Sequence, residues 1–284
     1  MRAAYLILAI AFSLSAIEPR SYRQALDLYN HTDYPAAISA LRQLPEEARS
    51  LELLGRCYLM NADYKKATET LEKAAALEPD NSMIQTWLGR AYGRRAETSF
   101  ALTALGQANK AREALERAVQ LDPKNGEAID DLFDYYVQAP GLVGGGFDKA
   151  NKLLPLIGQI DPAQEYYAEA KLAEQKKDFD TAEAQFRRAL QVAPNQVSRI
   201  LELAKFLSRH GRPEEGDKLY ERAYRLAPQS PRLLFARAQM WIQSRRNIDQ
   251  ARDLLKQYLA SKNLTPDDPS KLDALRLLKK VDGM

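Results

Sequence analysis

The chain has 284 residues, and its 41 basic and 38 acidic side chains give a net charge of +3. Because these charges are interspersed rather than gathered in a basic stripe, no nucleic-acid partner is predicted. A single cysteine (Cys57) excludes an internal disulfide and is expected to be buried, and two isolated histidines (His31 and His210) without a metal-binding motif predict no metal site and no cofactor.

Residues 1–16 have the pattern of a signal peptide. One Arg precedes an apolar run from Ala3 to Phe12, and small residues follow, so cleavage is expected near Ser15 or Ala16. The run is shorter than the ~20 residues of a membrane-spanning helix. We therefore expect an exported chain, periplasmic or secreted, with no stable membrane insertion after the signal is removed. An uncleaved N-terminal membrane anchor is the alternative.

A helical pattern then recurs between residues 17 and 264. Its anchor is a small residue, such as Ala67. A large apolar residue follows four positions later, here Leu71, and another apolar residue follows three positions after that, here Ala74. Offsets of 0, 4 and 7 lie on one face of an α-helix. Pro ends five of the copies. The seven anchors are Ala37, Ala67, Ala111, Ala150, Ala182, Gly216 and Ala251.

A second helix precedes each of these helices and carries its own small residue. Leu54, Gly55 and Tyr58 mark one copy, and Gly89 and Tyr92 mark the next. A small residue in the middle predicts a close contact with a neighbouring helix. Because a helix pair of this kind cannot bury its apolar face alone, successive pairs must stack into a solenoid.

These positions resemble the tetratricopeptide repeat family, whose pattern has Leu, Gly or Ala and Tyr on the first helix, an aromatic residue before the second, and a closing Pro. Residues 47–79 match nearly throughout, with Tyr64 as the aromatic residue, and the resemblance covers roughly residues 20–262. It implies an all-α, right-handed superhelical solenoid of about seven antiparallel helix pairs. It also implies a non-catalytic scaffold or adaptor that holds a protein or peptide partner in a concave groove lined by first helices.

Two insertions interrupt the repeat of about 34 residues. Residues 93–110 predict extra turns on both helices of their pair, either as a docking ridge or as a tolerated length variant. Residues 138–147 are rich in glycine and predict a compact turn with positive φ. The alternative is an anion site formed by the amides of Gly144, Gly145 and Gly146. The protein would then be an accessory subunit that binds a small ligand there, for example for transport.

The chain ends with a predicted capping helix in residues 265–284. Thr265 is expected to cap it, with a Pro in its first turn and an amphipathic run after it. A solenoid needs such a terminal helix because one face of the last repeat would otherwise be exposed.

The groove-facing positions carry alternating charge. Arg90 and Arg94 lie one turn apart and are placed to grip a carboxylate. The Asn pair by which some family members hold a C-terminal carboxylate is absent. The charges favour an extended or helical peptide of complementary charge. The candidate groove residues are Arg49, Glu52, Arg56, Arg90, Arg94, Asp130, Asp134, Tyr167, Lys171 and Lys205, and farther along the chain Phe235 and Gln239.

No catalytic constellation is present in the sequence. Asp130, Asp131 and Asp134 lie on one predicted helix, where paired carboxylates serve acid–base chemistry in some enzymes. On a helix that also carries Ile129 and Leu132, we interpret them as its polar face, and a hydrolase that depends on Asp134 is the least favoured alternative. The chain is predicted not to be an enzyme.

Overall fold

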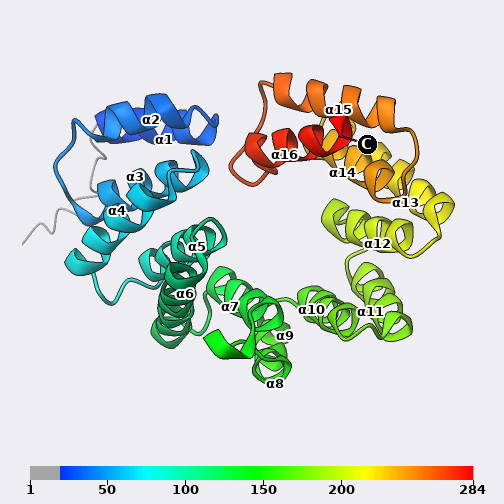
Figure 1. Cartoon of the computed structure of the whole chain (residues 1–284), viewed down its shortest axis with the longest axis horizontal. Coiled ribbons are helices and arrows are strands. Elements are labelled where there is room, and N and C mark those ends of the chain that lie inside the picture. The colour runs from blue at the N-terminus through cyan, green and yellow to red at the C-terminus, as the bar shows by residue number, and fades with distance from the viewer. Residues whose placement is uncertain (1–19, 284) are drawn as a thin grey trace, which may run out of the picture.

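The computed structural model describes residues 20–283, and all of the regular secondary structure in this range is helical (Figure 1). The predicted signal peptide lies outside the described residues. Seven helix pairs and one terminal helix, α16 (Lys271–Asp282), follow one another, as predicted. The pairs are α1 (Arg20–Asn30) with α2 (Tyr34–Leu41), α3 (Ala48–Met60) with α4 (Tyr64–Leu77), α5 (Ser82–Glu97) with α6 (Ala101–Leu121), α7 (Gly126–Gln138) with α8 (Phe147–Asn151) and α9 (Leu154–Ile160), α10 (Pro162–Gln175) with α11 (Phe179–Val192), α12 (Val197–Arg209) with α13 (Pro213–Leu226), and α14 (Pro231–Gln243) with α15 (Ile248–Ala260).

The turn inside a pair has a recurring chemistry. In the second pair Ala62 adopts a φ of 61°, and Asp63 follows as the cap of α4, where its side chain accepts a hydrogen bond from the Lys66 amide at 3.2 Å. In the fifth pair Lys177 and Asp178 repeat this geometry. An Asp cap satisfies an otherwise unpaired amide at the start of a helix. The turn that leads into the second helix therefore has the same local geometry in both pairs.

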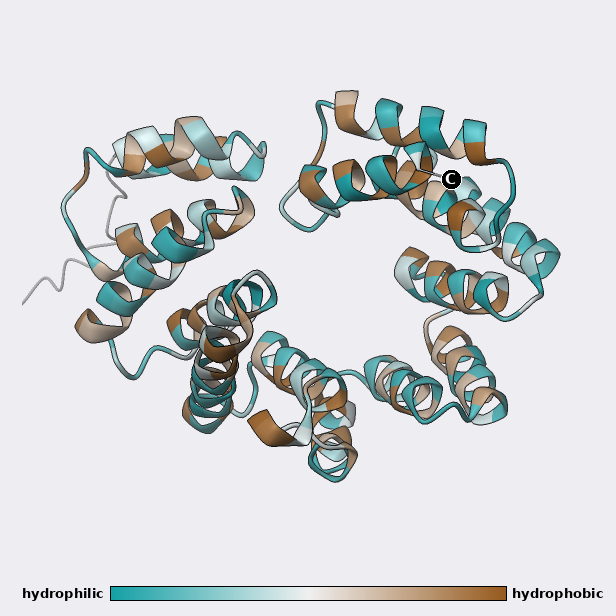
Figure 2. Ribbon diagram, viewed as in Figure 1, coloured by the Kyte–Doolittle hydropathy of each residue, from teal (hydrophilic) through white to brown (hydrophobic). Residues whose placement is uncertain are grey.

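The predicted anchors form the core. Ala37, Ala67, Ala182 and Ala251 are fully buried. The structure differs at Leu154, which is only partly buried because the predicted single helix is broken between α8 and α9. Figure 2 shows hydrophobic and hydrophilic residues on different sides of the helices, as expected for pairs that bury one face.

The first helices pack closely against the second helices at two glycines, and the cysteine is buried in the same core. A Cβ at Gly55 would lie 2.5 Å from Cγ of Leu71, and one at Gly89 would lie 2.6 Å from Cγ of Leu115. Cys57, as predicted, is fully buried, and burial raises the pKa of its thiol to about 12. The small residues are therefore needed for the packing of first helix on second helix.

The first insertion extends its pair, as predicted. Helices α5 and α6 have 16 and 21 residues, and Phe100, which precedes α6, and Leu102, in its first turn, are exposed. The second insertion forms a short 3₁₀ turn, Gly141–Val143 (η1), followed by positive φ at Gly144 and Gly146. Both insertions are thus compact extensions of the repeat.

The capping helix begins later than predicted. Ser270 caps it through a hydrogen bond from the Asp273 amide, whereas Thr265 donates its amide and hydroxyl to the Asp268 carboxylate in the preceding turn. The sequence reason is Pro269, because a helix that started at residue 265 would lose a backbone hydrogen bond there. The prolines also disfavour helical backbone at the residues that precede them.

The helix pairs are arranged in a ring around a central opening (Figure 1). Helices α1–α4 lie on one side of the gap in this ring, and α14–α16 lie on the other. The last helix packs on α15 and α14, with Ala274 and Val281 buried against Tyr258 and its neighbours. None of the helices in residues 20–283 combines the length and the apolar character needed to cross a bilayer.

The close approach at Gly89 gives the first prediction. Replacement of Gly89 by Ala should lower the free energy of unfolding by about 1–3 kcal/mol, because the new methyl group overlaps the Leu115 side chain. Replacement of Gly93, which lies in the same helix with no atom within 4 Å of its ideal Cβ, should instead raise it by about 0.5–1 kcal/mol through helix propensity. Urea denaturation of both variants measures this. Equal changes in the free energy of unfolding for the two variants would contradict the close packing of Gly89 on Leu115.

Candidate functional site

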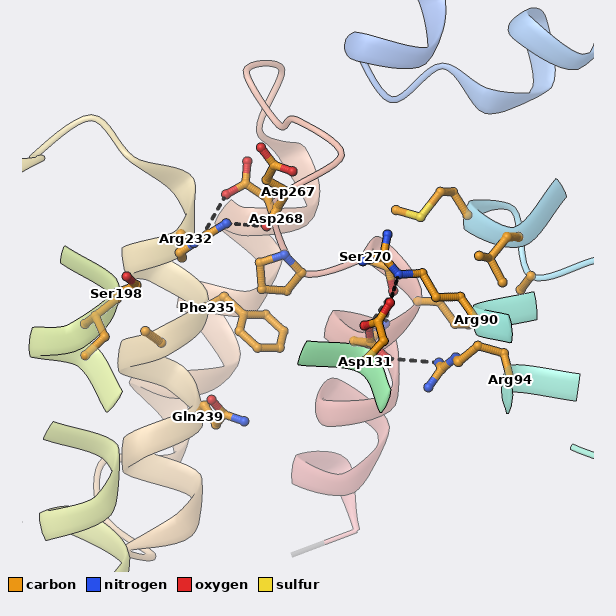
Figure 3. Close-up of a pocket in the computed structure, with 18 of the residues that line it drawn as sticks. Arg90, Arg94, Asp131, Ser198, Arg232, Phe235, Gln239, Asp267, Asp268 and Ser270 are labelled. Atoms are coloured by element: carbon orange, nitrogen blue, oxygen red, sulfur yellow. Dashed lines mark hydrogen bonds and ion pairs between the residues drawn. The ribbon is translucent and has the colours of Figure 1, made fainter. Parts of the chain in front are cut away.

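A pocket of about 620 Å³ lies inside the ring, and we refer to it as the central pocket (Figure 3). It is formed mainly by residues of α3, α5, α7, α12 and α14 together with residues 267–273, which precede and begin α16, and Ala62 and Tyr64 contribute from the turn before α4 and its first residue. All five helices are first helices of their pairs, so the surface expected to be the concave groove forms its walls. Residues of the second and third helix pairs thus border the same cavity as residues close to the C-terminal end of the described chain.

The walls of the central pocket are largely apolar. Leu59, Met60 and Trp87 contribute from one side of the ring, and Leu201 and Phe235 contribute from the other. Figure 3 shows Phe235 and Gln239 on one helix facing Arg90, Arg94 and Asp131 across the pocket. The predicted groove positions Phe235 and Gln239 are therefore brought into the site.

Three of the ten candidate charged and aromatic groove residues line the central pocket, namely Arg90, Arg94 and Lys205. Asp134 lies beside Arg90 and Arg94 in a second hollow of about 380 Å³ between α5, α6 and α7. The other predicted residues do not line the central pocket: Arg49, Glu52, Arg56, Asp130, Tyr167 and Lys171.

The predicted groove residues outside the central pocket, together with Arg90, form a series of contacts between successive first helices. We call this series the inter-repeat ladder. Arg56 of α3 lies over the Tyr29 ring of α1 at 4.8 Å and over the Trp87 ring of α5 at 4.5 Å. Its guanidinium also donates to the Tyr29 hydroxyl at 3.2 Å and to the Glu52 carboxylate at 3.4 Å. Such cation–π contacts are worth about 0.5–2 kcal/mol each. Arg56 therefore ties three repeats together. At the first repeat, Arg49 lies 4.6 Å from the centre of the Tyr22 ring.

The ladder continues with ion pairs. Arg90 of α5 lies over Trp87 at 4.4 Å and pairs with Glu127 at 2.9 Å and with Asp131 at 2.5 Å, both on α7. Lys171 of α10 then donates to the Asp134 carboxylate of α7.

Farther on, Arg199 of α12 lies 4.8 Å from the centre of the Tyr167 ring of α10. Lys205 pairs with Glu202 on its own helix, at 2.5 Å. The charges that the sequence assigns to partner binding are thus largely engaged with other side chains of the protein, on the same helix or on a neighbouring repeat.

Asp131 is a pocket residue that the sequence reasoning did not place in the groove. Burial raises its pKa to about 6, although the Arg90 guanidinium acts in the opposite direction. Burial likewise raises the pKa of Asp130, whose neighbours include Gln164 and Arg199. Helical spacing put Asp131 on the same polar face as Asp130 and Asp134. Only the contact between α5 and α7 distinguishes it from them.

The glycine-rich loop has its amides in use. The Gly144 amide donates to the Gly141 carbonyl, the Gly145 amide to Pro140 and the Gly146 amide to Tyr136, at 2.8–3.2 Å. A Cβ at Gly145 would lie 1.8 Å from the Ala139 carbonyl oxygen, so this glycine is required by the turn itself. No amide of the three remains to face an anion, and the small-ligand alternative loses the geometry on which it depends.

The two ends of the described chain meet at a seam beside the central pocket. A hollow of about 350 Å³ lies there, between the Tyr34 and Asn61 region and residues 264–275. Across this seam the guanidinium of Arg94 lies 3.9 Å from the carboxylate of Asp273, and it also pairs with Glu97 at 2.8 Å. We use the term seam for this contact region, between residues 32–62 and residues 264–275. No sequence pattern signals it, because its two sides are separated by most of the chain.

The raised pKa of Asp131 gives a prediction with a defined sign. An acid whose pKa rises on folding, here from 3.8 to about 6, favours the folded state at low pH, and this contribution is lost as pH increases through the folded pKa. The free energy of unfolding of the wild type relative to Asp131→Asn should therefore fall between about pH 4 and pH 7, by on the order of 2 kcal/mol.

Urea denaturation of both proteins across this pH range measures the difference. In the variant Arg90 retains Glu127 as a partner, so the comparison does not leave the cation unpaired. A difference between the two proteins that does not change with pH would contradict the burial of an ionisable Asp131.

Comparison with known proteins places these repeats in a family. Models of the tetratricopeptide repeat match residues 22–82, 99–125, 163–196 and 198–240. The chain is 28% identical over 159 residues to the CTR9 homolog of Arabidopsis thaliana, which covers 55% of this chain and 14% of that protein. It is 30% identical over 95 residues to DnaJ homolog subfamily C member 3 of Gallus gallus, which covers 32% of this chain and 19% of that protein. The chain therefore spans less than a fifth of these relatives.

Solved structures share the fold. A tetratricopeptide repeat protein of Parabacteroides merdae matches with a TM-score of 0.60 at 16% identity, over 93% of this chain and 100% of that one. A thermophilic tetratricopeptide repeat protein of Thermus thermophilus matches with a TM-score of 0.55 at 23% identity, over 66% of this chain and 97% of that one. The repeats, their stacking and these matches agree: the chain belongs to the tetratricopeptide repeat family.

Proposed function

We propose that this protein-interaction scaffold acts without catalysis outside the cytoplasm and holds a peptide segment of its partner in the central pocket. The observation that supports the proposal best is the origin of the pocket walls. Five first helices and the segment before α16 contribute to one cavity, which combines apolar surface with charged groups. This is the composition expected of a binding site rather than of a filled core.

The dimensions of the central pocket favour a peptide segment over a folded domain. Its volume of about 620 Å³ lies within the range of roughly 300–1,000 Å³ of small binding sites. A few side chains fit into such a space, where Trp87 and the exposed part of the largely buried Phe235 offer apolar contact. An extended segment is the simplest carrier of side chains into a groove of this kind.

The inter-repeat ladder supports the same function by keeping the walls in place. Arg56 and Arg90 both lie over Trp87, which is itself a wall of the central pocket. A side chain held by two such contacts loses little rotamer freedom when a ligand binds, so less free energy opposes association. We infer that the inter-repeat ladder holds the walls in position. The contacts with the ligand are then made by other residues that line the central pocket.

Export is supported by the sequence pattern of residues 1–16 and is compatible with the state of the cysteine. An exposed unpaired thiol would be open to oxidation and intermolecular pairing in an oxidising compartment. Cys57 is fully buried, and its raised pKa keeps it in the unreactive thiol form. We therefore propose a periplasmic or secreted location.

The pocket assignment is tested by filling the cavity. Short random peptides displayed on phage are selected on the immobilised protein, and the affinity of the selected peptides is measured by fluorescence polarisation. Gln239→Trp should weaken their binding by about tenfold or more, a loss of roughly 1.4 kcal/mol or more, because the indole would occupy the space that the peptide uses. Gln239 lines the central pocket and is only partly buried, so the substitution does not disturb the core.

The matched control is Gln257→Trp, which places the same side chain at an exposed position on α15. It should bind the selected peptides as the wild type does. Peptides that bind both variants equally well would place the binding surface elsewhere and would overturn the pocket assignment.

The proposed location makes a prediction about the mature chain. When the protein is expressed in a bacterium, its mass in the periplasmic or culture fraction should correspond to a chain that begins at Ala16 or Ile17, because the signal is removed near that point. Intact-mass spectrometry of the fractions measures this. Full-length protein in the membrane fraction would support the anchored alternative, and full-length protein in the cytoplasm would contradict export.

A further inference from the structure

The cations of the central pocket are already paired. Arg90 has Asp131 and Glu127, and Lys205 has Glu202 at 2.5 Å. Arg94 pairs with Glu97 at 2.8 Å and lies 3.9 Å from Asp273. Arg232, the fourth cation, lies 3.6 Å from the Asp268 carboxylate and donates to the Asp267 carbonyl. An incoming carboxylate would therefore have to displace a carboxylate of the protein at each of these positions.

The carboxylates of the central pocket outnumber these cations. Five acidic residues line it against four basic ones, although the whole chain has a net charge of +3. Outside the lining, Glu97 and Glu127 pair with pocket arginines and Arg276 pairs with Asp273 at 3.2 Å, so seven carboxylates stand against five cations once these partners are included. The local field therefore has the opposite sign to the net charge of the protein, and it favours a cation in the pocket.

One acidic side chain is available to a ligand. Within the described part of the chain, the Asp267 carboxylate takes part in no hydrogen bond or ion pair, and the residue is exposed. Figure 3 shows Asp267 beside Asp268 on the loop before α16, at one end of the central pocket. Arg232 is bound to the backbone carbonyl of Asp267 and leaves its carboxylate unpaired. A ligand cation at this position would gain a partner without displacing one.

Apolar surface lies close to this acidic end. Phe235 is on α14, the same helix as Arg232; the residue is 8% exposed and lines the central pocket. Leu201 of α12 and Leu272 of α16 also line the central pocket. A ligand that meets both surfaces must carry a cation and an apolar group close together.

We propose that the central pocket selects a peptide segment that presents a Lys or Arg side chain to Asp267 and an adjacent large apolar side chain to Phe235. This inference rests on the proposed peptide-binding function and specifies its partner. It replaces the expectation from the sequence that Arg90 and Arg94 grip a carboxylate, because both are engaged by the protein itself.

The sequences of phage-displayed random peptides selected on the full chain test this specificity. Peptides that bind the wild type but not Gln239→Trp should be enriched in Lys or Arg next to an aromatic or branched aliphatic residue. For a synthetic copy of one such peptide, Asp267→Asn should weaken binding about two- to fivefold, as expected for one exposed ion pair. The matched control Asp253→Asn, at an exposed site on α15, should leave binding unchanged.

A change in the peptide gives a second measurement that does not depend on the folding of a variant. Replacement of its Lys by norleucine should lower affinity for the wild type by the same factor and should have little effect on affinity for Asp267→Asn. The two losses should not add, because both remove one ion pair.

The outcomes separate this inference from the function on which it rests. Some selected peptides should fail to bind Gln239→Trp. If these peptides are enriched in Asp or Glu, or require a free C-terminal carboxylate, the proposed specificity is overturned and peptide binding in the central pocket still stands. Selection of no peptide, or only of peptides that tolerate Gln239→Trp, would contradict the peptide-binding function itself, and the proposed specificity with it.

Discussion

The close contact between a small residue on one helix and a leucine on the next is the constraint on which the structure depends. Gly55 receives Leu71, and Gly89 receives Leu115, at distances that exclude a Cβ atom. Both contacts lie inside a helix pair, between α3 and α4 and between α5 and α6. Each pair that is closed in this way still has an apolar face that it cannot bury alone, so successive pairs must stack on one another. Each repetition turns the chain by a small rotation. Over seven pairs the rotation brings the residues before α16 close to α3 and α5, and the central pocket is formed between them.

Charged residues on the first helices serve this geometry as well as the site. Arg56 and Arg90 lie over Trp87, and Arg90 reaches Asp131 on the next first helix. Such contacts fix the relative position of neighbouring repeats and at the same time neutralise the cations that face the groove. Ligand recognition is then left to groups without an internal partner, of which Asp267 is the clearest example. The framework and the specificity of the site are therefore carried by different residues.

The helix faces could be predicted from the sequence because helical spacing and glycine or proline positions are local properties. The anchors at Ala67 and Ala182, the extra turns around residues 93–110 and the burial of Cys57 all follow from such patterns and were found in the structure. The start of α16 was predicted too early because Thr265 is a good capping residue in isolation, whereas Pro269 moves the cap to Ser270. The pairing of Arg90 with Asp131 and the meeting of the two ends depend on the superhelical geometry, which no local pattern encodes.

The central claim is that both ends of the superhelix border one pocket in the protein without a partner. Spin labels at Asn61→Cys and Lys271→Cys, two exposed positions on opposite sides of the seam, measure this most directly by double electron–electron resonance. The buried Cys57 does not compete for the label while the protein is folded. A single narrow distribution at the short end of the measurable range is the result that the account predicts. A broad distribution of long distances would show an open superhelix and would contradict it.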